Sequence, residues 1–141
     1  MTKTKALILL ALLVLFFSSA AFAAHKHLEN EYQSQWCAEQ HGVTEYVLDD
    51  STRVDCLTDE YAIEFDFGPK WAEAIGQSLY YAEKTGRKPG IVLILETKTS
   101  GRYLKRLKVV AEKYNIKVWT MKPEDLSARH SRAGGNPEVS K

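Results

Sequence analysis

The sequence is poor in cysteine and lacks the common short catalytic motifs. Only two of its 141 residues are cysteine, Cys37 and Cys56, and no CxxC pair occurs. This excludes a CxxC-based zinc or redox centre. A glycine-rich phosphate loop and a recognisable Ser-His-Asp arrangement are also missing. The candidate chemistry must therefore come from other residue types.

A strong net charge is absent as well. The chain carries 19 Lys and Arg against 18 Asp and Glu, for a formal net charge of +1. Between residues 24 and 126 the balance is mildly acidic, with 17 acidic and 14 basic residues. Bulk charge therefore gives no support to nucleic-acid binding, and any such binding must rest on local patches.

The first 23 residues have the three parts of a secretory signal peptide. A short basic start precedes 12 apolar residues, Ala6–Phe17, and small Ala21 and Ala23 occupy the −3 and −1 positions of a cleavage site. A retained anchor is the alternative, but this run is shorter than the ~20 residues that a spanning helix needs. We expect cleavage after Ala23 and export to the periplasm or the medium. Residues 24–126 are expected to form one domain, and the aperiodic residues 127–141 a disordered tail.

Export bears on the two cysteines. In an oxidising compartment, Cys37 on an expected helix and Cys56 on an expected strand are candidates for a single disulfide. Two buried thiols are the alternative.

Hydrophobic periodicity and turn residues predict an α/β domain with the order αβββαβαβ and no internal repeat. The expected helices cover residues 28–41, 70 or 71–85, and 102–114. The expected strands cover residues 44–48, 53–57, 61–67, 91–95 and 116–121. Strand 91–95 follows Pro89-Gly90 and is apolar throughout, which is typical of a central strand buried on both faces.

The strand Tyr61–Phe67 carries acids at positions where an ordinary amphipathic strand has Thr, Ser or Lys. Glu64 and Asp66 share one face, and the aromatic residues share the other. The aromatic face is expected to pack on a helix, which leaves the acidic face as a shallow surface that Asp55 of the neighbouring strand can join. Clustered carboxylates repel one another, so a divalent metal is the economical explanation. A solvated sheet face is the alternative.

The helix after this strand presents Gln77 and Tyr81, spaced i, i+4, along one flank, with Lys70 at its head. Such a pair can be plain helix surface, or it can overhang the carboxylates from the end of the adjoining strand.

The stretch from Asp55 to Tyr81 resembles the PD-(D/E)XK nuclease superfamily, which includes many restriction endonucleases, Holliday-junction resolvases and RecB-type nuclease domains. Its members share the αβββαβ order, an Asp on the second strand and an acid-x-Lys element on the third strand. Several branches add a Gln and a Tyr on the next helix. The resemblance spans roughly residues 28–121 and implies a restriction endonuclease-like mixed central sheet flanked by helices.

The resemblance also implies site residues. By this comparison the catalytic residues are Asp55, Glu64, Lys70, Gln77, Tyr81 and Glu31, with Glu45 as the rival of Glu31. The implied ligands of Mg²⁺ (or Mn²⁺) are Asp55, Glu64 and Asp66.

One departure from the family concerns the lysine. Asp66 stands where the family has the Lys of acid-x-Lys, and Lys70 follows four residues later. A lysine in this role orients a water and neutralises charge in the transition state of phosphodiester hydrolysis. If Lys70 does not reach the site, the protein binds metal yet cleaves poorly.

These patterns predict an exported, metal-dependent nuclease acting on DNA or RNA. The alternatives are a degenerate nuclease-fold binding module of the periplasm and a small metal-binding envelope protein without catalysis. A local basic patch is the candidate contact for a phosphate backbone, and a solvated helix face is the simpler alternative. Its members are Lys98, Arg102, Lys105, Arg106 and Lys108.

Overall fold

The computed structural model describes residues 24–126, which form an α/β domain around one five-stranded mixed sheet. The helices are α2 (Glu29–Glu39), α3 (Trp71–Thr85) and α4 (Gly101–Tyr114), with short 3₁₀ turns η1 (Gly68–Lys70) and η2 (Lys98–Ser100). The strands are β1 (Val43–Val47), β2 (Arg53–Leu57), β3 (Tyr61–Phe67), β4 (Lys88–Ile94) and β5 (Lys117–Met121). The predicted order αβββαβαβ is confirmed. The predicted signal peptide and C-terminal tail lie outside the described residues.

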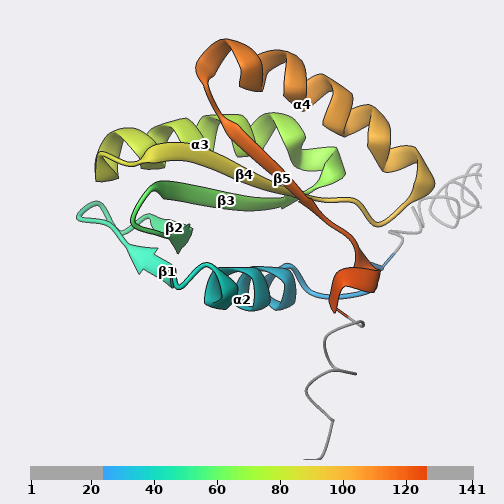
Figure 1. The fold of residues 1–141 in the computed structure, drawn as a ribbon, viewed down its shortest axis with the longest axis horizontal. Helices are drawn as coiled ribbons and strands as arrows, with labels where there is room; N and C mark the ends of the chain where they lie inside the picture. Colours follow the sequence, from blue (N-terminus) through green and yellow to red (C-terminus); the bar gives the residue numbers. More distant parts are fainter. Residues whose placement is uncertain (1–23, 127–141) are drawn as a thin grey trace, which may run out of the picture.

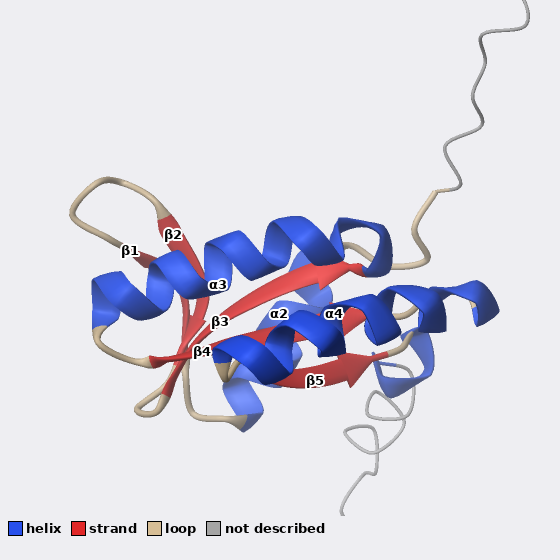
Figure 2. Ribbon diagram, turned by 90° about the horizontal axis from the view of Figure 1, so that it is seen from above, coloured by secondary structure: helices blue, strands red, loops and turns tan. Residues whose placement is uncertain are grey.

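The strands lie in the order β1-β2-β3-β4-β5. The first three are antiparallel neighbours, whereas β4 runs parallel to both β3 and β5. Each parallel pair is joined through a helix, and crossovers of one hand place both helices on the same face of the sheet. Figure 1 shows α3 and α4 together on that face and α2 on the opposite face. Figure 2 shows α3 running beside the β1–β2 hairpin.

Two hydrophobic layers hold these parts together. One lies between α2 and the sheet and includes Tyr32, Phe65 and Val92. The other lies between the sheet and α3 with α4, and includes Ile91 and Leu107. The adjacent β4 residues Ile91 and Val92 therefore enter opposite layers, which confirms β4 as a strand buried on both faces.

The start of β4 differs from the prediction. Pro89 and Gly90 were expected to precede the strand, but both pair with β3. Gly90 fits because a Cβ there would come within 2.9 Å of the Trp119 ring and 3.0 Å of Ile63. The glycine therefore provides room for a close side-chain approach, and the predicted start of this strand at Ile91 is wrong.

A disulfide joins Cys37 of α2 to Cys56 of β2, with Cα atoms 5.7 Å apart. The expected bridge is confirmed, and the alternative of two buried thiols is wrong. Gly42 lies against the bridge, since a Cβ there would be 2.6 and 2.7 Å from the two sulfurs. The bridge fixes α2 beside Asp55, the residue that precedes Cys56. Between residues 24 and 126, no helix has the length and apolarity needed to cross a membrane.

Candidate active site

The candidate site lies where β2 and β3 separate. The two strands pair only at Cys56↔Ile63 and Leu57↔Ala62. Beyond this point, the Asp55 carboxylate accepts a hydrogen bond from the backbone N–H of Phe65, at 2.8 Å through Oδ2. The Asp55 side chain thus takes the place of a backbone carbonyl as the acceptor for the Phe65 N–H. This bond holds the Asp55 carboxylate at the opening between the strands.

The β1–β2 ladder is also interrupted at this level. Its register omits Glu45 and Asp55, and Glu45 has a φ of 53°, a left-handed conformation that is unfavourable for a residue with a side chain. The buried side chain of Gln33 bridges the interruption. Its Nε2 donates to Glu45 Oε1 at 2.8 Å and to the Asp55 carbonyl at 2.6 Å. Arg53 Nη1 lies 2.9 Å from Glu45 Oε2.

A cleft of about 650 Å³ opens at this point, between the β1–β2 hairpin, the start of α2 and one flank of α3. Two cationic side chains, Arg53 and Lys70, contribute to its wall. Its carboxylate side chains come from three strands and two helices: Glu29, Glu45, Asp55, Glu64, Asp66 and Glu73. The predicted acidic cluster is therefore larger than the three acids on β2 and β3.

The acidic face of β3 is buried, because α3 packs over the same face of the sheet. Glu64 is 5% exposed and Asp66 is 2% exposed. The predicted shallow surface and its alternative, a solvated sheet face, are both wrong. Within the described residues, Glu64 Oε2 and Asp66 Oδ1 are buried without a hydrogen-bond partner. Burial of an unpaired polar atom is costly, so these oxygens are suited to receive a ligand.

Burial and mutual repulsion keep protons in the cluster. The pKa of Glu64 is raised, first by burial and then by the neighbouring charges of Asp55 and Asp66. The pKa of Asp55 is raised by burial, against the lowering effect of the Phe65 N–H, and the charges of Glu29 and Glu45 raise it as well. The Asp55 and Glu64 carboxyl groups therefore lie close enough for their charges to interact. Without a cation the pair holds a proton that a bound metal would displace.

Lys70 lies at the mouth of the cleft. Its Nζ is 3.6 Å from Asp66 Oδ1, which is an ion pair too long for a hydrogen bond. The pKa of Lys70 is raised, chiefly by Asp66. Burial raises the pKa of Asp66 to about 7, although Lys70 opposes this shift. The exposed lysine side chain is thus attached to the cluster through Asp66.

Gln77 and Tyr81 also line the cleft, from α3. Tyr81 is buried, and burial raises the pKa of its hydroxyl, whereas a hydrogen bond from Gln77 lowers it. The two side chains therefore belong to the wall of the cleft that contains Glu64 and are more than plain helix surface.

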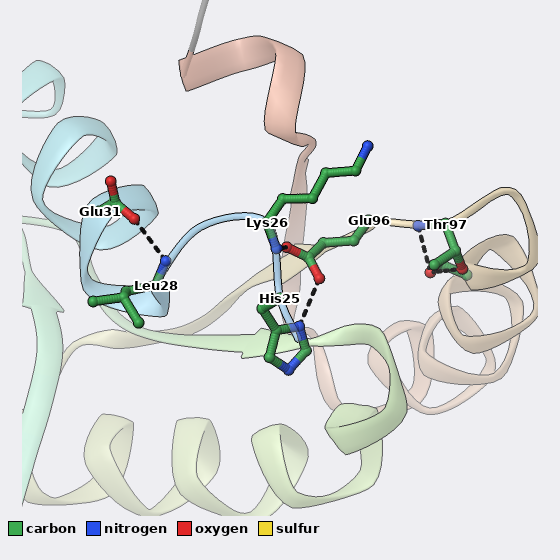
Figure 3. Close-up of polar contacts among 7 residues, drawn as sticks. His25, Lys26, Leu28, Glu31, Glu96 and Thr97 are labelled. Carbon is green, nitrogen blue, oxygen red and sulfur yellow. Dashed lines mark hydrogen bonds and ion pairs between the residues drawn. The ribbon is translucent and has the colours of Figure 1, made fainter. Parts of the chain in front are cut away.

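The two candidates for an additional acid occupy different places. Glu45 lines the cleft, but Glu31 lies outside it. Glu31 Oε2 accepts a hydrogen bond from the Leu28 N–H at 2.6 Å, at the start of α2, as Figure 3 shows. The acid that α2 brings to the cleft is Glu29. The pKa of Glu29 is raised by burial, with Lys70 acting in the opposite direction.

The sequence predictions missed Glu29, Gln33 and Glu73. A signal for the first two was present, because residues 29, 33 and 37 share one helix face at i, i+4 spacing. Since Cys37 bonds to Cys56, this face must point toward β2 and Asp55.

The basic patch is separate from the cleft. Its five residues are exposed around η2 and α4, and the cleft lining within residues 24–126 includes none of them. The guanidinium of Arg102 lies 4.7 Å from the centroid of the Tyr103 ring. This surface can contact a polyanion only at a distance from Asp55 and Glu64.

The donor set suits a hard divalent cation. Carboxylate oxygens are the ligands that Mg²⁺ prefers, and Mg²⁺ commonly uses one or two of them together with several waters. Asp55 and Glu64 provide such a pair. Across residues 24–126, no group of three or more His, Cys, Asp or Glu side chains is gathered so as to hold a metal ion. A cation held by Asp55 and Glu64 would therefore need waters or substrate oxygens to complete its coordination.

No protein-family model, curated protein or solved structure matches the chain.

Proposed function

We propose that the protein is a metal-dependent phosphodiesterase that hydrolyses DNA or RNA outside the cytoplasm. One observation carries this proposal: Asp55 and the buried Glu64, which has an unpaired carboxylate oxygen, face one cleft that also contains Lys70. An acidic cleft of this kind repels a phosphodiester unless a cation is bound.

Each residue has a specific part in this proposal. Asp55 and Glu64 would hold Mg²⁺ or Mn²⁺, and Asp66 would retain Lys70 beside them. The bound ion supplies Lewis-acid polarisation of the phosphate and a water of lowered pKa. Lys70 orients that water and stabilises negative charge on the phosphate. Gln77 and Tyr81, from the α3 wall of the cleft, contact the substrate beside Glu64.

The proposal is tested with the mature protein in two measurements. Calorimetry measures Mn²⁺ affinity, and a gel assay measures cleavage of labelled DNA and RNA with Mg²⁺ or Mn²⁺. We expect Asp55→Asn and Glu64→Gln to abolish cleavage and weaken metal binding while the domain stays folded. Asp59→Asn is the matched control, because Asp59 is an exposed acid in the turn between β2 and β3.

The outcomes separate the alternatives. Metal binding without cleavage of any nucleic acid supports a non-catalytic metal-binding protein. Nucleic-acid binding without metal binding or cleavage supports a degenerate binding module. Cleavage that persists unchanged in both site variants contradicts the roles of Asp55 and Glu64.

Export is part of the proposal. The disulfide between Cys37 and Cys56 is compatible with an oxidising compartment, where such bonds persist. Mass spectrometry of the protein recovered from the periplasm or medium should give Ala24 as the first residue. Recovery of only the full-length chain from membranes contradicts export with cleavage.

We also propose that the basic patch contacts the phosphate backbone. Five exposed cations release counterions on binding, so affinity should fall steeply as salt rises. Replacement of Lys105 and Arg106 by Gln should weaken binding and reduce its salt dependence. An unchanged salt dependence leaves this patch as a solvated helix face.

A further inference from the structure

The cleft has a closed end. At this end Tyr81, which lines the cleft from α3, packs in a small hydrophobic cluster with Leu48, Val54 and Ala62. The other end, where α2 and α3 begin, carries the exposed side chains of Leu28 and Lys70. A chain that enters past Lys70 and lies along the cleft must therefore stop or turn away at Tyr81.

The β1–β2 loop completes the closed end. Its residues Ser51 and Thr52 line the cleft, and Ser51 has a φ of 68° at the left-handed position of a tight hairpin. Two contacts attach the loop to α3, which runs beside the hairpin (Figure 2). Lys84 Nζ lies 2.5 Å from Asp49 Oδ1, and the Tyr80 hydroxyl donates a hydrogen bond to Asp50 Oδ2.

The size of the cleft limits what fits. A volume of about 650 Å³ lies in the range of small-molecule sites, enough for on the order of one or two nucleotides and not for the side of a duplex. Two cations within the cleft, Arg53 and Lys70, can meet phosphates on a short segment.

We propose that the cleft takes the end of a single strand, and that the β1–β2 loop, held to α3 by Tyr80 and Lys84, determines this preference. This inference rests on the proposed nuclease function. It adds that a continuous strand is a poor substrate, because a strand without an end must pass the closed end of the cleft.

The experiment compares linear and circular single strands of one sequence, as DNA and as RNA, with Mn²⁺. We expect the wild-type protein to cut the linear strand at least about tenfold faster than the circle, as a 1.4 kcal/mol difference in transition-state binding gives. The double variant Tyr80→Phe/Lys84→Gln removes both attachments without changing a residue that lines the cleft. It should cut the circle faster and bring the two rates together. The control is Lys113→Gln/Tyr114→Phe, a similar pair near the end of α4.

Each result has a distinct meaning. Equal wild-type rates on linear and circular strands overturn the inference and leave the nuclease function standing. A wild-type preference for ends that persists in a folded double variant overturns the role of the loop. The absence of cleavage on every substrate rejects the proposed function, and the inference falls with it.

Discussion

Asp66 should make the metal-free protein less stable as pH rises. Asp66 is 2% exposed, and burial raises the pKa of its carboxyl from 3.8 to about 7. Between these values the folded protein holds a proton that the unfolded chain releases. The contribution of Asp66 to stability is therefore complete below about pH 3.8 and is lost as pH rises through about 7.

The size of this effect follows from the same pKa values. A change from 3.8 to about 7 corresponds to about 4 kcal/mol of unfolding free energy. Burial of Glu64 and Glu29 acts in the same direction. The pKa of Asp50 is lowered to about 2, chiefly by its hydrogen bond with Thr52, so Asp50 changes stability with pH in the opposite direction. This change is confined to pH values below about 4 and does not affect the range above it. Lys70, with a raised pKa, titrates far above this range.

Urea unfolding monitored by tryptophan fluorescence tests this in the presence of a chelator. The wild-type unfolding free energy should fall between about pH 4.5 and about pH 7.5, and Asp66→Asn should reduce that fall by about 3 kcal/mol. The exposed-acid variant Asp59→Asn should keep the wild-type slope. A wild-type stability that is constant or rises over this range would refute the reasoning, as would an unchanged slope in Asp66→Asn.

Three further predictions concern the bridge, its neighbour and the lysine. Replacement of both Cys37 and Cys56 by Ser should lower the unfolding free energy by about 3 kcal/mol, measured in urea, and an unchanged midpoint contradicts this. Gly42→Ala should lower the unfolding free energy by about 1–3 kcal/mol, because its Cβ would meet both sulfurs. Gly76→Ala, with open space around its Cβ, should be neutral or stabilising. Equal shifts of the urea midpoint in the two variants contradict this packing. Lys70→Ala should leave Mn²⁺ affinity unchanged in calorimetry and reduce turnover at least about tenfold. An equal loss of affinity and turnover would mean that Lys70 acts through metal binding.

The helices and strands could be predicted from the sequence, but their packing could not. The bounds of β2 and β3 were predicted correctly, because turn residues flank both strands and apolar residues alternate within them. The start of β4 was predicted wrongly, because a Pro-Gly pair can precede a strand or, as here, lie within one and give an aromatic ring room to approach the backbone. Only the position of Trp119 distinguishes this use of Gly90 from a turn.

Much of the site depends on tertiary contacts that no local pattern specifies. The positions of Asp55, Glu64 and Gln77 on their elements followed from strand and helix periods. The burial of Glu64 and Asp66 did not, because it depends on how α3 crosses β3. The left-handed backbone at Glu45 also had no sequence signal, since it arises from the interruption between β1 and β2.

Several features that destabilise the fold occur together at this cleft. Glu64 has a buried oxygen without a partner, Glu45 has an unfavourable backbone, and the ladders on both sides of Asp55 are broken. The disulfide and Gln33 hold α2 against this same region and offset part of the cost. An acidic surface without a function could lose these features by simple substitutions such as Glu64→Leu, which would improve packing. Their concentration around one cleft that faces an exposed lysine is expected of a site that binds a cation, and it is the physical reason to prefer a metal-dependent function for these acids.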